Sequence, residues 1–173
     1  MIDEKSAKKA PRKKANSKAS TPNKLYTLCV YLLNVPISGK YAGKTISRTI
    51  QIRGDQTLED LHLAIFRAFN REDEHLYEFN FGKGPSDRSA IYTLKSDIPY
   101  PIFGQEEGDV ETTTINSLGL AVGRAFGYLF DFGDEWLHQI NVIGVEDLLG
   151  RGKYPKIVAR EGRSPPQYTD EEG

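Results

Sequence analysis

Residues 126–142, FGYLFDFGDEWLHQINV, constrain the fold more than any other part of the chain. Aromatic and β-branched residues stand on both sides of a short polar segment, which is the pattern of two paired strands. Gly133 and Asp134 match the glycine-first pair of a type II′ turn. The sequence therefore predicts a β-hairpin with these two residues at its tip.

This turn decides which side chains of the hairpin share a face. We expect Asp131 opposite Trp136 and Leu129 opposite His138. Side chains alternate along a strand, so Asp131, Trp136 and His138 then share one face. Asp134, in the turn, is expected to bond loop amides, while Asp131 points toward a pocket or polar network. We expect Trp136 to be mostly buried and His138 to present one ring nitrogen to a cleft.

The clearest helix signal begins at Thr57 and predicts a helix over 58–69. Thr57 is a favourable N-cap, and Asp60 follows three residues later, as in a capping box. His62 lies at the margin of the apolar stripe, where a half-buried histidine bonded to a carbonyl or carboxylate is expected. The apolar residues at helical spacing are Leu58, Leu61, Ile65 and Phe69.

The predicted strands lie near 25–35, 45–52, 75–82, 125–131 and 136–143. In the third of these, His75, Tyr77, Phe79 and Phe81 occupy alternate positions and give one aromatic face. Strand, helix and strand in this order indicate an α+β fold. We expect a mostly antiparallel sheet with one main covering helix, similar to an α/β roll. A C-terminal β-hairpin carries the DFGDEWLH stretch.

With 173 residues, of which 38% are apolar, the chain fits one globular domain with ragged ends. We expect a disordered basic tail at 1–23, a single domain at 24–168 and an acidic tail at 169–173. The single cysteine, Cys29, cannot form an intramolecular disulfide and fits a reducing compartment. No apolar run approaches the roughly 18 residues of a transmembrane helix, so we expect a cytoplasmic protein without membrane contact.

The net charge of −1 conceals an asymmetry along the chain. Residues 1–24 hold eight basic and two acidic residues, a net of +6, which leaves 15 basic and 22 acidic residues, a net of −7, for residues 25–173. The basic segment has no apolar periodicity and cannot bury enough surface to offset its ordering entropy. Two interpretations are open: an arm that contacts nucleic acid, or a solvated terminus.

The candidate binding residues are His62, His75, His138, Asp131, Asp134 and Trp136. Imidazole and carboxylate are the ligands of two-histidine, one-carboxylate sites for a divalent transition metal, and the three histidines with Asp131 are the metal candidates. Asp131 and His138 are the catalytic candidates. No compact HExxH spacing accompanies them. The alternative is a structural hydrogen-bond network around Trp136.

Other catalytic motifs are incomplete or missing in the sequence. Asp131-Phe132-Gly133 matches the kinase metal-binding tripeptide, but the glycine-rich loop, the strand lysine and the catalytic-loop signature of kinases do not accompany it. The chain has no phosphate loop and no dinucleotide fingerprint. These observations favour a binding role.

Four segments carry a resemblance to a known family: RTIQIRGDQTLEDLHLAIFRAF, DEHLYEF, FGYLFDFGDEWLHQINV and YPKIVAREGRSPPQY. Taken in this order, over residues 25–168, they resemble the plasmid pRiA4b ORF-3-like family, most specifically at 128–138. The resemblance implies an α+β fold and a link to plasmids or mobile elements, without a defined reaction. Many relatives place cysteines around a Pro-Pro-Glu-Asp segment, whereas this chain has Ser164-Pro165-Pro166-Gln167-Tyr168. This departure argues against a metal role for the segment.

The sequence as a whole favours a non-enzymatic binding module for a protein or nucleic-acid partner. An aromatic-rich sheet face and long polar loops suit such a partner. The alternative is a metal-dependent hydrolase or related enzyme that uses the three histidines with Asp131 and Asp134.

Overall fold

The computed structural model describes residues 22–35, 39–95 and 106–168. The strands in these ranges are β1 (Lys24–Leu32), β2 (Ser47–Arg53), β3 (Tyr77–Asn80), β4 (Ile91–Thr93), β5 (Glu106–Asp109), β6 (Ala125–Phe130), β7 (Trp136–Asp147) and β8 (Lys156–Glu161). The helices are η1 (Gly39–Tyr41), α1 (Leu58–Ala68) and η2 (Asn116–Leu118). The predicted acidic tail and residues 1–21 of the predicted basic tail lie outside the described residues.

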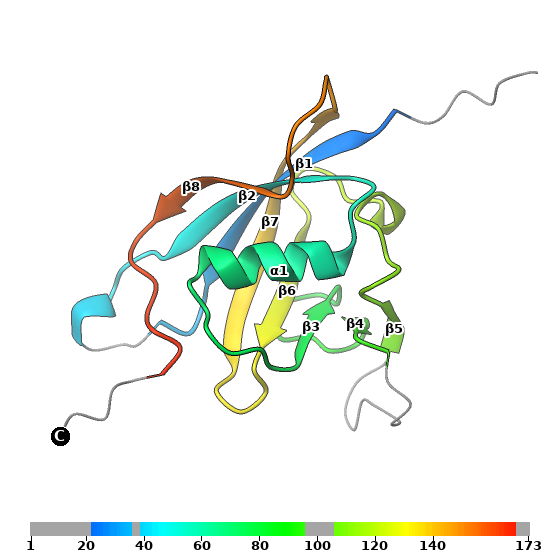
Figure 1. Cartoon of the computed structure of the whole chain (residues 1–173). Helices are drawn as coiled ribbons and strands as arrows, with labels where there is room; N and C mark the ends of the chain where they lie inside the picture. Colours follow the sequence, from blue (N-terminus) through cyan, green and yellow to red (C-terminus); the bar gives the residue numbers. More distant parts are fainter. Residues whose placement is uncertain (1–21, 36–38, 96–105, 169–173) are drawn as a thin grey trace, which may run out of the picture.

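All of these strands belong to one open sheet, in the order β5-β4-β3-β6-β7-β1-β2-β8. Neighbouring strands are antiparallel except β4 and β5, which are parallel. The helix α1 lies across one face of the sheet (Figure 1). The predicted α+β class, with a mostly antiparallel sheet and one main covering helix, is confirmed.

The helix α1 begins at the predicted residue because its first turn caps itself. The Thr57 hydroxyl accepts from the Asp60 amide at 3.2 Å, and the Asp60 carboxylate accepts from the Thr57 amide at 2.9 Å. These reciprocal bonds satisfy two amides that the helix leaves unpaired. The helix ends before Asn70, which has a φ of 54°. No helix in the described ranges is long and apolar enough to cross a membrane.

The core fills the space between α1 and the sheet face beneath it. Leu28, Val30 and Ile50 on the central strands are fully buried there, as are Leu61 and Ile65 on the helix. The alternation of side chains along each strand puts every second residue on this face. The positions between them lie on the opposite face, away from α1, which we call the open face (Figure 1).

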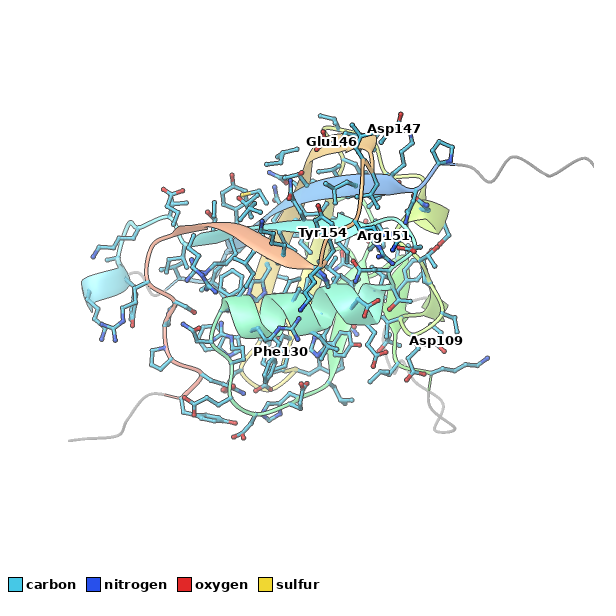
Figure 2. All side chains as sticks on the ribbon, turned by 45° about the horizontal axis from the view of Figure 1, so that its top comes forward. Asp109, Phe130, Glu146, Asp147, Arg151 and Tyr154 are labelled. Carbon is cyan, nitrogen blue, oxygen red and sulfur yellow. The ribbon has the colours of Figure 1, made fainter. Side chains whose placement is uncertain are left out.

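The aromatic face predicted for the third strand is part of this core. Phe79 is fully buried, with its ring 4.9 Å from that of Tyr128. Phe130 lies against α1, with its ring 5.8 Å from that of Phe66 (Figure 2). The expectation that an aromatic sheet face receives a partner is therefore wrong, because α1 covers that face.

Candidate functional site

The hairpin of β6 and β7 has a five-residue connection, 131–135, in place of the predicted two-residue turn. Phe130 pairs with Trp136, and Tyr128 pairs with His138. The predicted register is thus wrong, and Asp131 lies in the loop, off the face that Trp136 and His138 share. The left-handed positions of this loop are Asp131, with φ 62°, and Glu135, with φ 53°.

Asp131 holds the loop together, a role that the sequence assigned to Asp134. One carboxylate oxygen of Asp131 accepts from the amides of Gly133, at 2.9 Å, and Asp134, at 3.3 Å. The Glu135 amide donates to the Asp131 carbonyl at 2.7 Å. Asp131 is buried, whereas Asp134 is exposed. Aspartate tolerates the left-handed conformation because its side chain bonds nearby amides in this way.

Trp136 and Arg71 form a stacked pair at the start of β7. The Arg71 guanidinium carbon lies 3.8 Å from the centre of the Trp136 ring. A guanidinium over an aromatic face is attracted to the ring quadrupole, more strongly where water is excluded. Trp136 is half-buried, which is less than the expected burial. Its ring N–H is buried without a hydrogen-bond partner within the described residues.

His138 is buried among aromatic rings. Its ring centre lies 4.9 Å from that of Phe69 and 5.2 Å from that of Tyr128. Burial, together with the charge of Arg71, lowers the pKa of His138 to about 3, so its imidazole is neutral at neutral pH. Both ring nitrogens are buried, and the imidazole interacts with the main chain of Tyr128 and Trp136. The expected cleft-facing nitrogen is therefore not present.

His62 is also buried, and both of its ring nitrogens have partners. Nδ1 lies 2.8 Å from the Tyr128 hydroxyl and Nε2 lies 3.2 Å from a Glu74 oxygen. The imidazole stacks on Tyr77, with ring centres 3.6 Å apart. Burial lowers the pKa of His62, although Glu74 opposes this effect. The contact with a carboxylate matches the expected structural histidine, but the side chain is fully buried and not half-buried.

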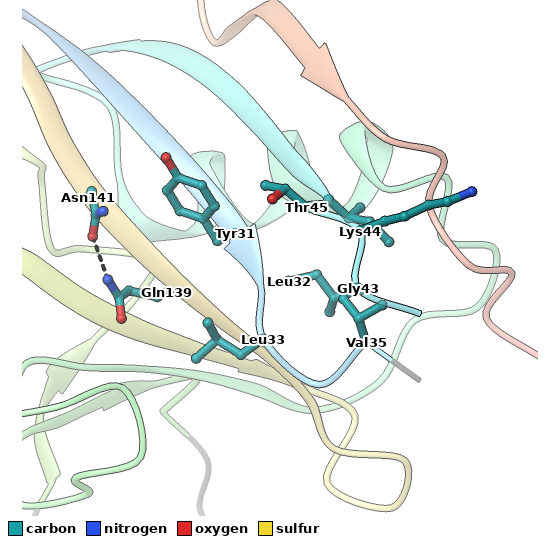
Figure 3. A pocket seen from close by; sticks show the side chains of 10 residues that line it. Tyr31, Leu32, Leu33, Val35, Gly43, Lys44, Thr45, Gln139 and Asn141 are labelled. Atoms are coloured by element: carbon teal, nitrogen blue, oxygen red, sulfur yellow. Dashed lines mark hydrogen bonds between the residues drawn. The ribbon is translucent and has the colours of Figure 1, made fainter. Parts of the chain in front are cut away.

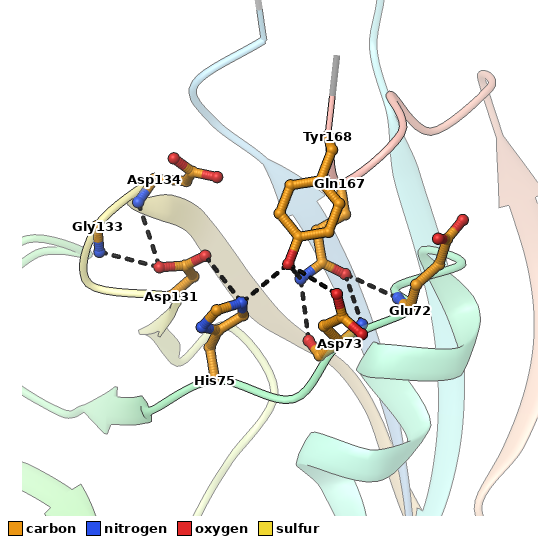
Figure 4. A network of polar contacts seen from close by, with 8 residues as sticks. All are labelled: Glu72, Asp73, His75, Asp131, Gly133, Asp134, Gln167 and Tyr168. Atoms are coloured by element: carbon orange, nitrogen blue, oxygen red, sulfur yellow. Dashed lines mark hydrogen bonds and ion pairs between the residues drawn. The ribbon is translucent and has the colours of Figure 1, made fainter. Parts of the chain in front are cut away.

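His75 lies at the surface in a polar network with the C-terminal segment (Figure 4). Its Nε2 is 3.1 Å from the Tyr168 hydroxyl and 3.6 Å from a second carboxylate oxygen of Asp131. The Tyr168 hydroxyl donates to the Asp73 carboxylate at 3.0 Å. Because a hydroxyl has one proton, the His75 nitrogen is the donor to Tyr168.

Gln167 anchors the same C-terminal segment to the turn after α1. Its side-chain oxygen accepts from the amides of Glu72, at 2.7 Å, and Asp73, at 3.1 Å, and its NH₂ group donates to the Asp73 carbonyl at 2.9 Å. Ser164 adds a bond from its hydroxyl to the Phe69 carbonyl at 2.9 Å. These contacts give the segment a structural role.

The three histidines do not assemble into a metal site. His62 and His138 are buried in separate aromatic surroundings, and His75 is at the surface. In residues 22–35, 39–95 and 106–168, no group of three or more His, Cys, Asp or Glu side chains could hold a metal ion. The set that the hydrolase alternative requires is therefore not brought together there.

The open face carries a cavity of about 430 Å³ beside the end of β1 (Figure 3). Leu33 and Val35 supply apolar surface, and Tyr31 supplies an aromatic ring with a hydroxyl. Gln139 and Asn141 line it from β7, and the Gln139 amide donates to the Asn141 side chain at 2.9 Å. The cavity is shallow and open to solvent on one side.

A second cavity of about 320 Å³ adjoins the first on the open face. Leu129 and Leu137 form its apolar lining, and Asn34 stands next to Leu33 of the first cavity. Arg88 and Glu78 also line it, and the guanidinium donates to both Glu78 oxygens, at 2.8 and 2.7 Å. Both cavities are lined from the end of β1 and from β7, and we refer to them together as the open-face groove.

Three residues in these arrangements were missed in the sequence. Arg71, Arg88 and Gln167 lie in polar segments without periodicity, so no local pattern marks them. The bonds of Gln167 join residues 94 and 95 positions apart. Only the tertiary arrangement shows such partners.

The comparisons with known proteins agree with this fold. A crystal structure of a protein of unknown function from Methanosarcina mazei Go1 is similar, with a TM-score of 0.65, at 23% identity, over 85% of this chain and 75% of that one. Among curated proteins, none matches the chain. A family model described as plasmid pRiA4b ORF-3-like protein matches residues 30–171. Because this match spans most of its length, the chain belongs to the plasmid pRiA4b ORF-3-like family.

Proposed function

We propose that the chain is a non-enzymatic binding module that takes a polypeptide segment in the open-face groove. The observation that carries this proposal is the pair of cavities on the sheet face away from α1. Leucine, amide and hydroxyl groups line them. These groups match an extended segment, since the leucines accept apolar side chains while the amides bond main-chain groups.

The exposed apolar side chains of the open-face groove support it as the binding site. Leu33 is 42% exposed although it borders the first cavity, and Leu129 and Leu137 are half-buried in the second. A partner that covered these side chains would remove apolar surface from water, at about 25 cal/mol per Å². Burial of these side chains would therefore contribute favourably to the free energy of binding.

Charge favours a polypeptide with basic residues over a nucleic acid in this groove. Residues 25–173 carry 15 basic and 22 acidic residues. In the groove itself Glu135 is balanced by Lys44 and Arg88 by Glu78, so the preference comes from the net charge of the surrounding chain. A phosphate backbone would be repelled by this net charge, whereas lysine and arginine side chains would be attracted.

Selection of random peptides displayed on phage against the full chain tests the proposal. We expect the selected peptides to share an apolar residue next to lysine or arginine. Leu33→Asp should weaken their binding at least about tenfold, which is about 1.4 kcal/mol. The matched control is Leu63→Asp, because Leu63 is 37% exposed on α1, away from the groove.

Three outcomes would overturn the proposal. They are a selection without enriched peptides, equal loss of binding in both variants, and no loss in Leu33→Asp. If no peptide binds and an oligonucleotide binds the wild type and both variants equally, the chain recognises nucleic acid at a site outside the groove. Amide chemical shifts of the bound chain would locate the site in either case.

A further inference from the structure

Arg71 is a buried cation with few contacts. Its residue is 7% exposed, in the turn that follows α1, and its guanidinium stacks on Trp136 at 3.8 Å. One terminal nitrogen donates to the Pro165 carbonyl at 3.3 Å. The other terminal nitrogen and Nε are buried without a partner within the described residues. A buried donor without an acceptor costs about 1–3 kcal/mol, and more when it is charged.

Arg48 shows how this fold pairs another buried arginine. Arg48 is 3% exposed, and its guanidinium donates to four main-chain carbonyls, of Ala68, Ser47, Glu161 and Gly162. Arg71 has one such bond. Burial lowers the pKa of Arg71 to about 10, so the side chain remains charged at neutral pH.

No carboxylate compensates this charge within the described residues. None of the ion pairs there includes Arg71. Asp131 bonds the hairpin loop and contacts His75, and Asp73 accepts from Tyr168. An isolated buried charge is strongly unfavourable unless an opposite charge or several hydrogen bonds satisfy it.

A second unpaired donor lies beside Arg71. The Trp136 ring N–H is buried and unpaired within the described residues, whereas the buried imidazole of His138 interacts with the main chain of Tyr128 and Trp136. Trp136 and His138 lie two residues apart on β7 and therefore share a face. Arg71 stacks on Trp136, so its guanidinium lies on the side of β7 that also carries His138.

We propose that Arg71 and Trp136 form a binding site for a small oxyanion group, the carboxylate or phosphate of a ligand. Arginine recognises such groups through two parallel N–H bonds. Stacking on Trp136 fixes the plane of the guanidinium, so its free edge is oriented before the ligand arrives. The indole N–H adds a donor, and the anion supplies the negative charge that Arg71 lacks. This site is on the α1 side of β7, separate from the open-face groove.

The only tryptophan of the chain makes this site directly observable. The single indole N–H signal in a ¹H–¹⁵N spectrum belongs to Trp136, so we would titrate the full-length chain with inorganic phosphate and, separately, with acetate. Chloride at matched ionic strength is the control. We expect a saturable shift of the indole signal with at least one anion and none with chloride. A response to phosphate alone indicates a phosphate-bearing ligand, and a response to acetate alone indicates a carboxylate.

Variants of Arg71 and Arg67 distinguish binding at this site from a general attraction of anions to positive charge. Arg71→Gln should weaken the titration at least about tenfold, whereas Arg67→Gln, which removes an exposed charge from the same end of α1, should leave it unchanged. If Arg71→Gln does not fold, Arg71→Lys keeps the charge without the fork of N–H groups and should still weaken binding. An indole signal that neither anion moves, or that moves equally with chloride or in the Arg71 variant, would overturn the proposal.

Discussion

At the scale of single residues, the two aspartates of the hairpin loop have different roles. Asp131 bonds two loop amides and has a positive φ, while Asp134 is exposed. Asp131→Ala should lower the free energy of unfolding by about 1–2 kcal/mol, because it removes these bonds and places alanine in the left-handed region. Asp134→Ala should change it by less than about 0.5 kcal/mol. Urea denaturation measures both values.

Asp131→Asn is the control for this prediction. Asparagine keeps a side-chain oxygen and tolerates the left-handed conformation, so its stability should be closer to that of the wild type than to that of the alanine variant. A larger loss in Asp134→Ala than in Asp131→Ala would contradict the assignment and restore the one expected from the sequence.

Trp136 supplies the main contact of a buried charge, so its loss should be costly. Trp136→Ala removes the ring under Arg71 and should lower the free energy of unfolding by about 3–5 kcal/mol. Trp136→Phe keeps an aromatic face for the guanidinium and should cost clearly less. Thermal unfolding followed by circular dichroism compares them, and equal losses in the two variants would show that the stacking contributes little.

At the scale of elements, the features that depend only on residues close in sequence were predicted correctly. The bounds of α1 follow from the capping box at Thr57 and Asp60 and from an apolar stripe, all within one short segment. The hairpin strands were also recognisable in the sequence, but their register was predicted wrongly. The register depends on the left-handed positions 131 and 135 of the loop. These positions hold aspartate and glutamate, so no glycine marks them.

The strand β8 was missed for a different reason. Its residues are exposed or half-buried on both sides, so no alternation of apolar and polar residues marks it. It is held by main-chain pairing with β2, in which every pair is more than a hundred positions apart, as in Ser47 opposite Glu161. A pairing of this kind leaves no trace in a local pattern.

The C-terminal segment after β8 depends on one amide side chain. Gln167→Ala removes three bonds to the turn after α1 and should lower the free energy of unfolding by about 1–3 kcal/mol. The segment after Glu161 should also be cleaved faster by protease. Tyr168→Phe, which removes only a partly exposed hydroxyl, is the matched control and should have a smaller effect. Unchanged cleavage in Gln167→Ala would show that other contacts hold the segment.

At the scale of the whole molecule, β7 separates the two proposed sites. Leu137 and Gln139 line the open-face groove, whereas Trp136 and His138 alternate with them and lie on the α1 side. The strand-level alternation was visible in the sequence, but which face α1 covers was not. The covered face became the aromatic core, and the open face retained the amides and leucines available to a partner.

The buried histidines make the stability of the whole fold depend on pH. The pKa of His138 is about 3 in the folded chain and about 6.5 when unfolded, so below about pH 6.5 the unfolded chain binds a proton that the folded chain cannot. The stability is complete above that pH and falls as pH is lowered. For His138 alone, the loss between pH 7 and pH 5 should be about 2 kcal/mol. The lowered pKa of His62 acts in the same direction.

His138→Phe tests this dependence, because phenylalanine fits among the rings of Phe69 and Tyr128 but cannot take up a proton. Urea denaturation at pH 7, 6 and 5 should show a shallower loss of stability in the variant than in the wild type, by about 2 kcal/mol over the full interval. Part of the pH dependence should remain, since His62 still titrates with a lowered pKa. Identical slopes for the two proteins would show that His138 is not the group that couples folding to protons, and that its surroundings admit water to the ring.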